Sequence, residues 1–540
     1  MKAIIVGGVA GGMSAATRLR RLMPDAEIVV LERGEHVSYA NCGLPYHLGG
    51  IIADREELLL QTPEGLHTRF GLDVRVRSEV LRIDRERKTV RVRERDGREY
   101  DESYDRLVLS PGAAPVVPPL PGVERALTLR TVTDVDRIVA ALDARPRTAV
   151  VVGGGFIGLE AAENLVHRGL TVTVIERDAQ VMAPLDPEMV APVHDELRRH
   201  GVRLRLGAAL AKVLPEAVAL ADGETIPADL VLMSIGVRPE TGLAREAGLT
   251  IGERGGILVD AAMRTSDPDI FAVGDAVEKP DAIGDAPTLI PLANTANRQG
   301  RLVADAIAGL PVRLGGRIGT GIVRVFGLTV ATTGWNEKRL RVAGRPYQAV
   351  HTHGASHAGY YPGAEPLSLK LLYDPADGRI LGAQAVGGEG VDKRIDVIAT
   401  AMRGGLTAPE LADLELAYAP PYGSAKDPVN ILGYVAGNRL AGTEEAAQWH
   451  ELAELVAAGA AVVDVRAASE YAAGHIPGAV HIPLDELRQR MTELPDGDLV
   501  VHCQSGQRSH TAVSLIRPGR AGRVLNLDGG YRTWQAGTGA

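Results

Sequence analysis

The chain has 540 residues, of which 45% are hydrophobic, and a formal net charge of −9. This length predicts about three or four domains with real cores, and the acidic balance gives no reason to expect nucleic acid as a partner. The apolar run before the first glycines is too short for a signal peptide, and no later window offers the roughly 20 apolar residues of a membrane span. We therefore expect a cytoplasmic protein without a membrane partner.

The first patterned segment is KAIIVGGVAGGMSAATRL, residues 2–19. It begins as an apolar strand, turns at glycines and continues as an alanine-rich helix; EIVVLER follows as a second strand that carries Glu32 near its end. This order predicts a dinucleotide-binding unit, in which an acid about 20 residues beyond the loop accepts a hydrogen bond from a ribose. The G-x-G-x-x-G pattern is incomplete here, because Val9 takes the place of the middle glycine.

The same order recurs in TAVVVGGGFIGLEAAENLVHRG, residues 148–169, which TVTVIER follows with Glu176 near its end. Glycine lets the backbone approach a pyrophosphate, whose charge then meets the free N–H groups and the positive dipole end of the following helix. A single loop of this kind also occurs for packing alone, but two loops, each with its acid, predict two nucleotide sites. In this second copy the glycine pattern is complete, at Gly153, Gly155 and Gly158.

A third motif, TSDPDIFAVGDA at residues 265–276, ends a short apolar run in Gly274 and Asp275. This places a carboxylate at the C-terminal end of a strand, where ligands of open α/β sheets bind; alone, the motif is equally a strand and a turn. Together with the two glycine loops it resembles the two-dinucleotide flavoprotein disulfide reductases. The resemblance covers roughly residues 1–435.

The resemblance implies an FAD site at the first loop and the Gly-Asp motif, and an NAD(P)H site at the second loop. Glu176 suits the free 2′-hydroxyl of NADH, whereas Arg177 could bind the 2′-phosphate of NADPH, so NADH is expected and NADPH stays open. The implied FAD contacts are Gly7, Gly8, Ala10, Gly11, Gly12, Glu32, Arg33, Gly274, Asp275 and Ala293. The implied NAD(P)H contacts are Gly153, Gly155, Phe156, Ile157, Gly158, Glu176 and Arg177.

Cys42, in SYANCGLPYHLGG, is one of only two cysteines, and the other, Cys503, lies more than 450 positions away. Ordinary reductases of this group carry a second cysteine after four intervening residues, where this chain has His47. Without a partner, Cys42 can be oxidised only to a mixed disulfide, a persulfide or a sulfenic acid. Catalysis would need a thiolate, stabilised by positive charge, helix ends or the flavin. The alternative is a small buried apolar side chain.

SYANCGLPY resembles the coenzyme A disulfide reductases more than the single-cysteine NADH oxidases and peroxidases, which present a histidine where this chain has Ala10. The resemblance makes Cys42 the redox cysteine. The basic cluster at residues 18–22 would then bind the phosphates of coenzyme A through guanidinium groups, although it is equally compatible with a solvated helix face. The implied coenzyme A contacts are Ser14, Arg18, Arg21, Ser38 and Asn41.

Tyrosines gather in GYYPGAEP and LAYAPPYGSAKDPVN. In the resembled family the region after the nucleotide-binding domains is a dimerisation domain, and one tyrosine from each segment reaches the partner's active site. We therefore expect a homodimer in which Tyr418 acts with either Tyr361 or Tyr360 as a hydrogen-bond or proton donor; simple interface packing is the alternative. Three nearby histidines, His351, His353 and His357, hint at a metal, but no metal site is expected.

A smaller α/β pattern begins after a short linker near residues 438–446. It contains AVVDVRAASEYAAGHIPGAVHIP and then DLVVHCQSGQRSH, which places Cys503 between a central strand and a helix, where backbone N–H groups lower a cysteine pKa and hold anions. Asp464, Arg466, Cys503 and Arg508 resemble the motifs of a rhodanese domain, which implies catalytic roles for Cys503 and Arg508. A tyrosine-phosphatase loop would need five residues between cysteine and arginine, and this chain has four.

The combined resemblance implies an NADH-dependent flavoprotein that reduces coenzyme A persulfide, polysulfide and coenzyme A disulfide. Cys503 would deliver sulfane sulfur to coenzyme A, and Cys42 would reduce the product. Two alternatives stay open, a coenzyme A disulfide reductase whose rhodanese domain senses or docks, and an NADH oxidase.

The expected fold class is α/β, with two Rossmann-like domains, an α+β dimerisation domain and a C-terminal rhodanese-like α/β domain. The predicted domains are residues 1–117 with 246–320 for FAD, 118–245 for NAD(P)H, 321–437 for dimerisation and 447–540 for rhodanese.

Overall fold

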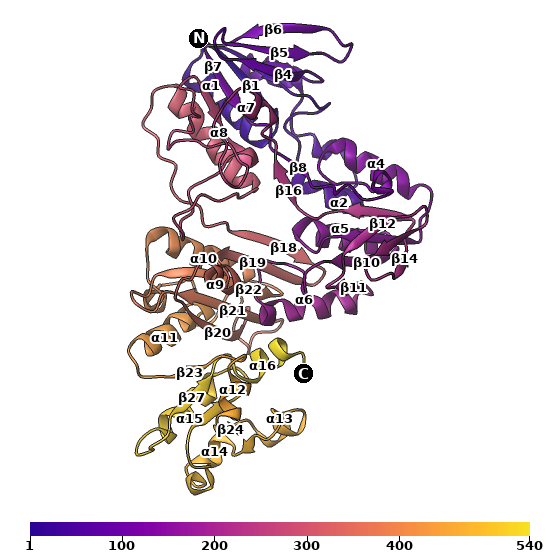
Figure 1. Cartoon of the computed structure of the whole chain (residues 1–540). Coiled ribbons are helices and arrows are strands. Elements are labelled where there is room, and N and C mark those ends of the chain that lie inside the picture. The colour runs from indigo at the N-terminus through magenta and orange to yellow at the C-terminus, as the bar shows by residue number, and fades with distance from the viewer. The chain divides into compact units, whose positions relative to one another are not determined.

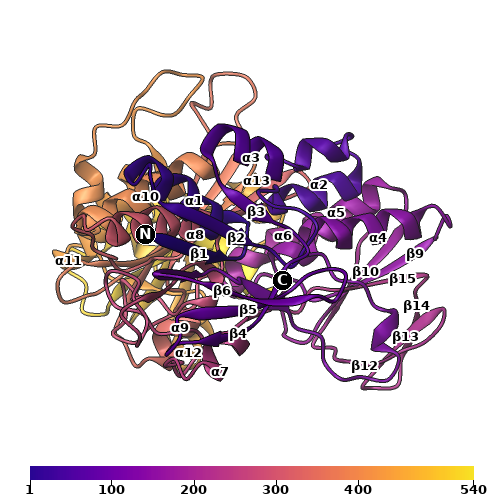
Figure 2. The ribbon, with the colours of Figure 1, turned by 90° about the horizontal axis from the view of Figure 1, so that it is seen from above.

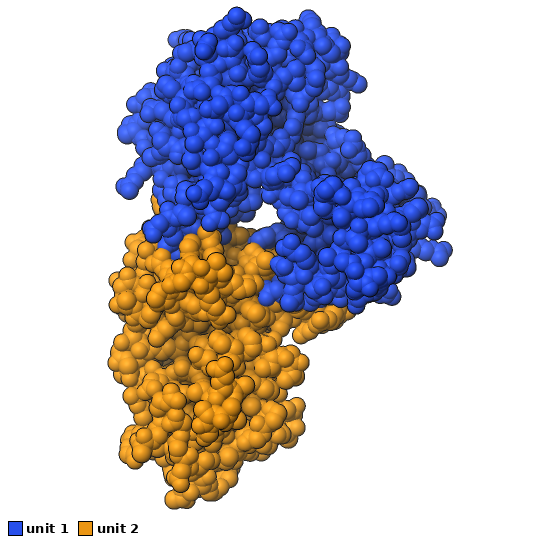
Figure 3. All heavy atoms as spheres, viewed as in Figure 1, with its two compact units in different colours: residues 1–181, 201–319 blue, residues 182–200, 320–540 orange.

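The computed structural model, drawn in Figure 1, describes all residues 1–540, and the chain divides into two compact units. Unit 1 comprises Met1–Val181 and Gly201–Gly319, and unit 2 comprises Met182–His200 and Thr320–Ala540 (Figure 3). Every helix is too short or too polar to cross a bilayer.

The first sheet of unit 1 is parallel, and its strands are buried on both faces. Ala3 and Ile5 pack with helices α1 (Ala10–Leu22) and α8 (Ala293–Ile307), which lie side by side (Figure 2), while Ile4 packs on the opposite face. Covering on both faces explains why the strands are apolar runs without alternation. Their order is β17 (Ile270–Ala272), β7 (Arg106–Leu109), β1 (Lys2–Val6), β2 (Glu27–Leu31) and β3 (Asp73–Arg75).

The second sheet of unit 1 repeats this plan with the second glycine loop. Its helix α5 (Phe156–His167) connects two neighbouring parallel strands, which makes a βαβ unit. The strand order is β11 (Arg203–Leu206), β10 (Thr171–Glu176), β9 (Thr148–Val152) and β15 (Leu230–Met233). Both predicted strand–glycine–helix–strand units are therefore confirmed.

Smaller elements complete unit 1. Two antiparallel sheets are formed by β4 (Glu79–Asp84), β5 (Thr89–Arg93) and β6 (Glu99–Ser103), and by β12 (Leu210–Val213), β13 (Ala217–Leu220) and β14 (Thr225–Pro227). Strands β8 (Ala113–Pro115) and β16 (Val237–Pro239) pair with each other. The other helices are α2 (Leu44–Gly49), α3 (Pro63–Phe70), α4 (Val132–Leu142) and α7 (Gly242–Glu246).

Unit 2 is built around an antiparallel sheet with helices α9 (Glu337–Val342), α10 (Val391–Gly404) and α11 (Pro428–Leu440), and it includes helix α6 (Pro187–Arg199). Val391, Ile395 and Ile398 of α10 pack with the sheet in one apolar core. The strand order is β18 (Gly321–Val325), β19 (Leu328–Gly334), β22 (Ile380–Gly387), β21 (Pro366–Tyr373) and β20 (Gln348–Ala355).

The last part of unit 2 is a parallel sheet in which β26 (Leu499–His502) is the middle strand and leads through Cys503 to helix α15 (Gln507–Ile516). This confirms the predicted placement of Cys503. The other strands are β23 (Ala446–Ala447), β27 (Val524–Leu527), β24 (Ala461–Asp464) and β25 (Val480–His481). The other helices are α12 (Leu452–Ala457), α13 (Ala468–Ala472), α14 (Leu484–Leu487) and α16 (Gly530–Thr538).

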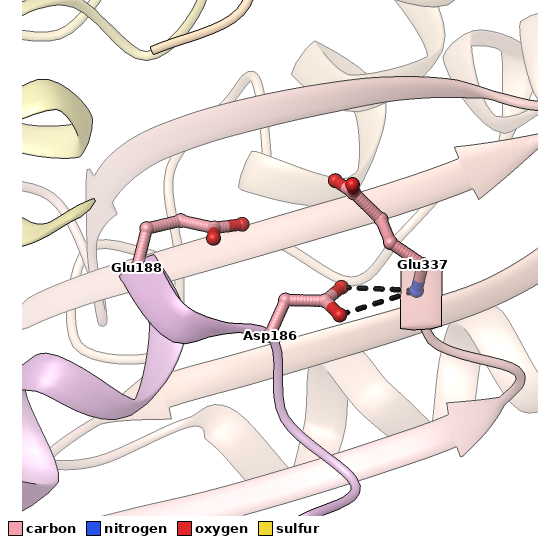
Figure 4. A group of neighbouring side chains, drawn as sticks. All are labelled: Asp186, Glu188 and Glu337. Carbon is pink, nitrogen blue, oxygen red and sulfur yellow. Dashed lines mark hydrogen bonds between the residues drawn. The ribbon is translucent and has the colours of Figure 1, made fainter. Parts of the chain in front are cut away.

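A buried ion cluster joins α6 to the antiparallel sheet of unit 2. Asp186, Glu188 and Glu337 converge as Figure 4 shows, and their carboxylates lie close enough together to suggest a metal site. The ammonium group of Lys370, which is fully buried, bonds all three; its Nζ lies 2.9 Å from Asp186 Oδ2 and 2.6 Å from Glu337 Oε1. Because a protein cation already satisfies these carboxylates, we interpret the group as an ion cluster.

Replacing Lys370 by Met should strongly destabilise the protein, because it leaves three buried carboxylates without a cation. We expect the free energy of unfolding to fall by about 3–5 kcal/mol, measured by denaturant unfolding. Lys426→Met is the matched control, since Lys426 is exposed, and it should change stability little. Equal stability of the two variants would contradict the assigned role of the cluster.

Candidate functional site

The first glycine loop has the tight geometry of a nucleotide cradle. Gly7 has a φ of 100°, and a Cβ on Gly12 would overlap the Gly7 carbonyl oxygen. Glu32, at the end of β2, accepts hydrogen bonds from the backbone N–H of Gly8 at 2.8 Å and of Gly34 at 2.7 Å. The acid is thus held beside the loop, where a ribose would need an acceptor.

The surroundings of Asp275 show whether the site at this loop fits FAD. Its Oδ1 is buried and has no hydrogen-bond partner in the protein, and burial raises the pKa of the carboxyl group. Gly274 is fixed beside it through a 3.0 Å bond from its N–H to Gln299, and α8 begins nearby at Ala293 with no side chain capping its N-terminus. A buried acceptor without a partner is costly unless a ligand hydroxyl binds it. The residues present therefore fit FAD.

The second loop combines a tight turn with open space. Gly153 has a φ of 106°, and a Cβ on Gly158 would overlap the Gly153 carbonyl oxygen. At Gly155, by contrast, no atom lies within 4 Å of where a Cβ would be. Glu176 Oε2 accepts a 2.8 Å hydrogen bond from the N–H of Gly154. The open side at Gly155 is where a pyrophosphate would approach the backbone.

Cys42 lies on the short 3₁₀ turn Asn41–Gly43 and is exposed. Its sulfur lies 3.9 Å from Asn41 Oδ1. Desolvation by the surrounding protein raises the pKa of Cys42, and the carboxylates of Glu160 and Asp275 raise it further. The polypeptide itself therefore does not lower this pKa through positive charge or helix ends, and stabilisation of the thiolate by the flavin stays a prediction.

Glu160, on α5, is a site residue that the sequence reasoning missed. Burial raises the pKa of its carboxyl group to about 7, and Glu163 adds to this. Tyr46, four residues after Cys42, donates a 3.2 Å hydrogen bond to Glu160 Oε1. A carboxyl group that titrates near neutral pH can hold or release a proton during catalysis. The available signal was its position two residues after Gly158, on the helix that begins at the nucleotide loop.

The residues expected to bind coenzyme A differ in whether their side chains already have hydrogen-bond or ion-pair partners in the protein. Ser14 donates a 2.8 Å hydrogen bond to Asn297, and Arg18 pairs with Asp305 at 2.7 Å, so both have partners on α8. Arg21 is exposed and makes no ion pair. Ser38 has a φ of 47°, an uncommon conformation for a residue with a side chain. Of the predicted arginines, Arg21 alone presents a free guanidinium.

The predicted tyrosines are exposed, and two of them pair. Tyr360 is 76% and Tyr418 is 47% exposed, and their hydroxyl groups lie 2.8 Å apart. This hydrogen bond raises the pKa of Tyr360. Tyr361 instead places its ring edge-on to His357, with ring centroids 5.5 Å apart. The structure thus brings Tyr360, rather than Tyr361, together with Tyr418.

His351 and His353 use both ring nitrogens in hydrogen bonds. His351 lies between Glu188 at 2.9 Å and Asp528 at 2.5 Å, and His353 bonds Ser368 at 2.9 Å and Thr533 at 2.8 Å. Protein groups therefore occupy the atoms that a metal would need.

Cys503 is 1% exposed and sits at the base of a loop that directs donors at its sulfur. The N–H of Gly506 lies 3.2 Å from the sulfur, and the hydroxyl group of Ser509 lies 3.5 Å from it. Gly530 has no room for a side chain, because a Cβ would be 2.9 Å from the N–H nitrogens of Ser505 and Gly506. Donors that converge on a sulfur suit it to hold an added, anionic sulfur atom.

Arg508 borders this loop but is held by an acid that the sequence reasoning did not single out. Its two terminal nitrogens each bond a carboxylate oxygen of Glu470 at 2.7 Å. This pair lowers the pKa of Glu470 to about 2 and raises that of Arg508. Arg508 is therefore fixed at the rim of the loop, near the sulfur.

Gly155→Ala should leave the fold intact but weaken nicotinamide nucleotide binding, because the methyl group meets no protein atom and projects where the pyrophosphate would approach. We expect the Kd for NADH to rise about tenfold or more, with an unchanged Tm. The control is Gly242→Ala, which also has open space and lies outside the loop. A Kd unchanged by Gly155→Ala would contradict the assigned site.

Glu160→Gln should make Cys42 more acidic, because it removes a negative charge that raises its pKa. In protein stripped of nucleotide, we expect iodoacetamide to label Cys42 about two- to fivefold faster at pH 8, followed by peptide mass spectrometry. Glu57→Gln, at an exposed acid, serves as the control. Identical rates in both variants would show that the charge of Glu160 does not reach the sulfur.

Three family models match successive parts of the chain. Residues 1–300 match the pyridine nucleotide-disulphide oxidoreductases, residues 321–428 match the dimerisation domain of that family, and residues 448–537 match the rhodanese-like domain. The coenzyme A disulfide reductase of Staphylococcus aureus (strain bovine RF122 / ET3-1) is 37% identical over 440 residues, which cover 81% of this chain and 99% of that protein.

Two solved structures resemble the whole chain. The reduced CoADR-RHD of Bacillus anthracis is 48% identical, with a TM-score of 0.98 over 100% of this chain and 98% of that one. The NAD-dependent persulfide reductase from A. fulgidus is 37% identical, with a TM-score of 0.93 over 99% of this chain and 100% of that one.

These matches confirm the predicted fold class, the oxidoreductase class and the dependence on FAD and a pyridine nucleotide. The domain boundaries and the roles of individual site residues stay predictions. The chain belongs to the pyridine nucleotide-disulphide oxidoreductase family and carries a dimerisation domain and a rhodanese-like domain.

Proposed function

We propose that this enzyme uses NADH and FAD to reduce coenzyme A persulfide and polysulfide, and also coenzyme A disulfide, with sulfane sulfur delivered by its rhodanese-like domain. Similarity to a coenzyme A disulfide reductase and to a persulfide reductase supports this proposal. So does the presence of a rhodanese-like domain in the same chain.

The observation that carries the proposal is the pair of unlike, unpaired cysteines. Cys42 is exposed and Cys503 is buried, and both are free. The donors from Gly506 and Ser509 make the Cys503 loop suited to hold a sulfur atom rather than to exchange disulfides at the surface. Cys42, open to solvent and without a second cysteine, suits a mixed disulfide with a diffusible thiol.

The chemistry balances as three sulfur exchanges. Cys503 thiolate attacks a sulfane sulfur of polysulfide and displaces a polysulfide shortened by one sulfur atom, and coenzyme A thiolate then attacks the outer sulfur of the Cys503 persulfide, giving coenzyme A persulfide and Cys503 thiolate. Cys42 thiolate attacks the inner sulfur of the persulfide, forms a mixed disulfide with coenzyme A and releases hydrosulfide. The sum is coenzyme A persulfide, NADH and a proton giving coenzyme A, hydrogen sulfide and NAD⁺.

When bound, FAD would supply the electron pair, taken from NADH, that returns the mixed disulfide to two thiols. Gly7, Gly12, Glu32 and Asp275 would hold it, and Glu160 would hold a proton beside Cys42. Since the pKa of Glu160 lies at about 7, its carboxyl group can be protonated or charged near neutral pH.

Coenzyme A would bind near Arg21, whose exposed guanidinium suits a phosphate group. Arg18 would join only by leaving Asp305, because the two form an ion pair in the protein. Ser14, Ser38 and Asn41 complete the proposed contacts.

NADH is the proposed nucleotide. Arg177 is 83% exposed and leans on Asp178, with 3.7 Å between Nε and Oδ1. With Glu176 beside it, a 2′-phosphate would meet two carboxylates for one arginine, and the free 2′-hydroxyl of NADH would avoid this repulsion.

The dimerisation domain supports a homodimer. In the proposal, the paired hydroxyl groups of Tyr360 and Tyr418 serve the active site of the partner subunit, where a phenol can protonate a departing thiolate. The geometry favours Tyr360 over Tyr361 as the partner of Tyr418.

Cys503→Ser should abolish sulfur transfer while leaving reduction of coenzyme A disulfide within about twofold of wild type, because each thiol serves one exchange. Cys42→Ser should abolish NADH oxidation with every sulfur substrate. Steady-state NADH oxidation with coenzyme A persulfide, polysulfide and coenzyme A disulfide measures both, with mass analysis of what is attached to Cys42.

Two results would replace the proposal. If the Cys503→Ser variant still reduced coenzyme A persulfide at the wild-type rate with polysulfide as the sulfur donor, a docking or sensing role for the rhodanese-like domain would be favoured. Rapid oxygen consumption without any sulfur substrate would favour an NADH oxidase.

A further inference from the structure

The turn after β27 shapes the loop that holds Cys503. Tyr531 donates its N–H to the Cys503 carbonyl at 2.8 Å, and Arg532 donates to Gln504 at 3.1 Å. Gly530 is packed against the N–H groups of the loop so closely that a Cβ would not fit. Asp528 begins this turn. The groups that bind the Asp528 side chain therefore affect where the hydrogen-bond donors around the Cys503 sulfur lie.

Asp528 is held by groups outside the rhodanese-like domain. Its Oδ2 lies 2.5 Å from His351 Nδ1 on β20, and its Oδ1 lies 2.5 Å from Arg439 of α11. The other ring nitrogen of His351 lies 2.9 Å from Glu188 on α6. The side chains of His351, Glu188 and Asp528 are all at most 2% exposed. Water is thus excluded from this contact, and the loss of any one of its hydrogen bonds would leave a buried polar group without a partner.

The hydrogen bonds of His351 require that its ring carry two protons. Both ring nitrogens face carboxylate oxygens, Nδ1 toward Asp528 and Nε2 toward Glu188, and an ionised carboxylate only accepts. A neutral ring could donate to only one of them and would turn a nitrogen lone pair toward the other carboxylate, which is costly in a dry site. The other charged groups around the contact are Lys370 beside Glu188, and Arg439 with Glu444 beside Asp528.

We propose that His351, protonated and held between Glu188 and Asp528, is a positioning residue for the Cys503 loop. Through Asp528 and the turn that follows it, His351 fixes the donors around the sulfur to the reductase part of unit 2. The inference rests on the proposed function, since it assigns this positioning to the sulfur-transfer half of the reaction.

The electrostatics agree with this geometry. Burial lowers the pKa of His351, but Asp528 and Glu188 outweigh it and raise the pKa to about 9, against the opposing charge of Lys370. Burial lowers the pKa of His353, two residues along β20, to about 3, so the proton resides on His351. A raised pKa means that the contribution of His351 is complete below its ordinary value, about 6.5, and is lost as the pH rises through about 9.

The test compares two variants of the full-length flavoprotein, Glu188→Gln and Glu337→Gln. Both remove one carboxylate from Lys370, but only Glu188 contacts His351. Sulfur transfer is measured from thiosulfate to cyanide between pH 6 and 10, is corrected for the fraction of cyanide that is ionised at each pH, and is divided by the rate of coenzyme A disulfide reduction at the same pH. In wild type this ratio should fall with a midpoint near pH 9.

Glu188→Gln should move that midpoint down by about one pH unit or more, while Glu337→Gln leaves it in place. Below the midpoint, Glu188→Gln should keep the wild-type ratio within about twofold, since protonated His351 still binds Asp528 there. A midpoint that is the same in all three proteins would overturn the inference. So would a parallel change in the two activities.

Hydrogen exchange gives a readout that does not depend on turnover. His351→Gln should speed exchange of the amides of residues 503–506 and 529–531 by about tenfold at pH 7, because the turn loses its anchor. Arg523→Gln, which breaks an exposed pair with Asp498 in the same domain, is the control. Unchanged exchange in His351→Gln would overturn the inference. Absence of sulfur transfer in wild type at every pH would instead refute the proposed function, with exchange still testing the anchor.

Discussion

A lysine ammonium surrounded by carboxylates holds together segments of unit 2 that are far apart in the sequence. Lys370 lies on the central part of an antiparallel sheet, and its partners come from the N-terminus of α6 and from α9. Full burial makes each ion pair dependent on the others, because a charge left alone in a dry interior is strongly unfavourable. Glu188 belongs to both Lys370 and His351, so the same network extends to the rhodanese-like domain. The docking of that domain is thus continuous with the core of its neighbour.

The two sulfurs are placed in opposite environments. Cys42 is exposed among carboxylates that raise its pKa, whereas Cys503 is buried among hydrogen-bond donors. A thiol that is weakly acidic until its partners assemble is protected from random oxidation, because the thiolate is the reactive form. A sulfur that is enclosed and contacted by an N–H group and a hydroxyl group is suited to carry a labile sulfur atom. In the proposed function, one chain thereby separates the task of receiving sulfur from the task of reducing it.

Local features of this fold were accessible from the sequence, and distant pairings were not. The glycine loops, the strand that precedes Asp275 and the strand-to-helix position of Cys503 follow from short patterns whose backbone requirements are local. The partner of Arg18 is Asp305, 287 residues away, and the Glu188–Lys370 pair spans 182 residues. Such pairs depend on how distant segments pack together, and no spacing rule in the sequence predicts them. The raised pKa of Cys42 in the polypeptide was missed for the same reason, since it arises from burial and from Glu160 and Asp275, which lie far from Cys42 in the sequence.

The connection into the rhodanese-like domain has little slack. α11 runs to Leu440, β23 begins at Ala446, and between them the buried Glu444 bonds both Asn526 and His510 of that domain. A chain that is cut at this connection, so that the rhodanese-like domain is lost, would therefore expose His351, Arg439 and the carboxylate of Glu188 to water. The remaining reductase would therefore differ from the full-length protein, because a set of charged groups that is buried in the full chain would be exposed to solvent. Evolutionary loss or gain of such a module at this junction would require compensating changes in the sheet beneath it.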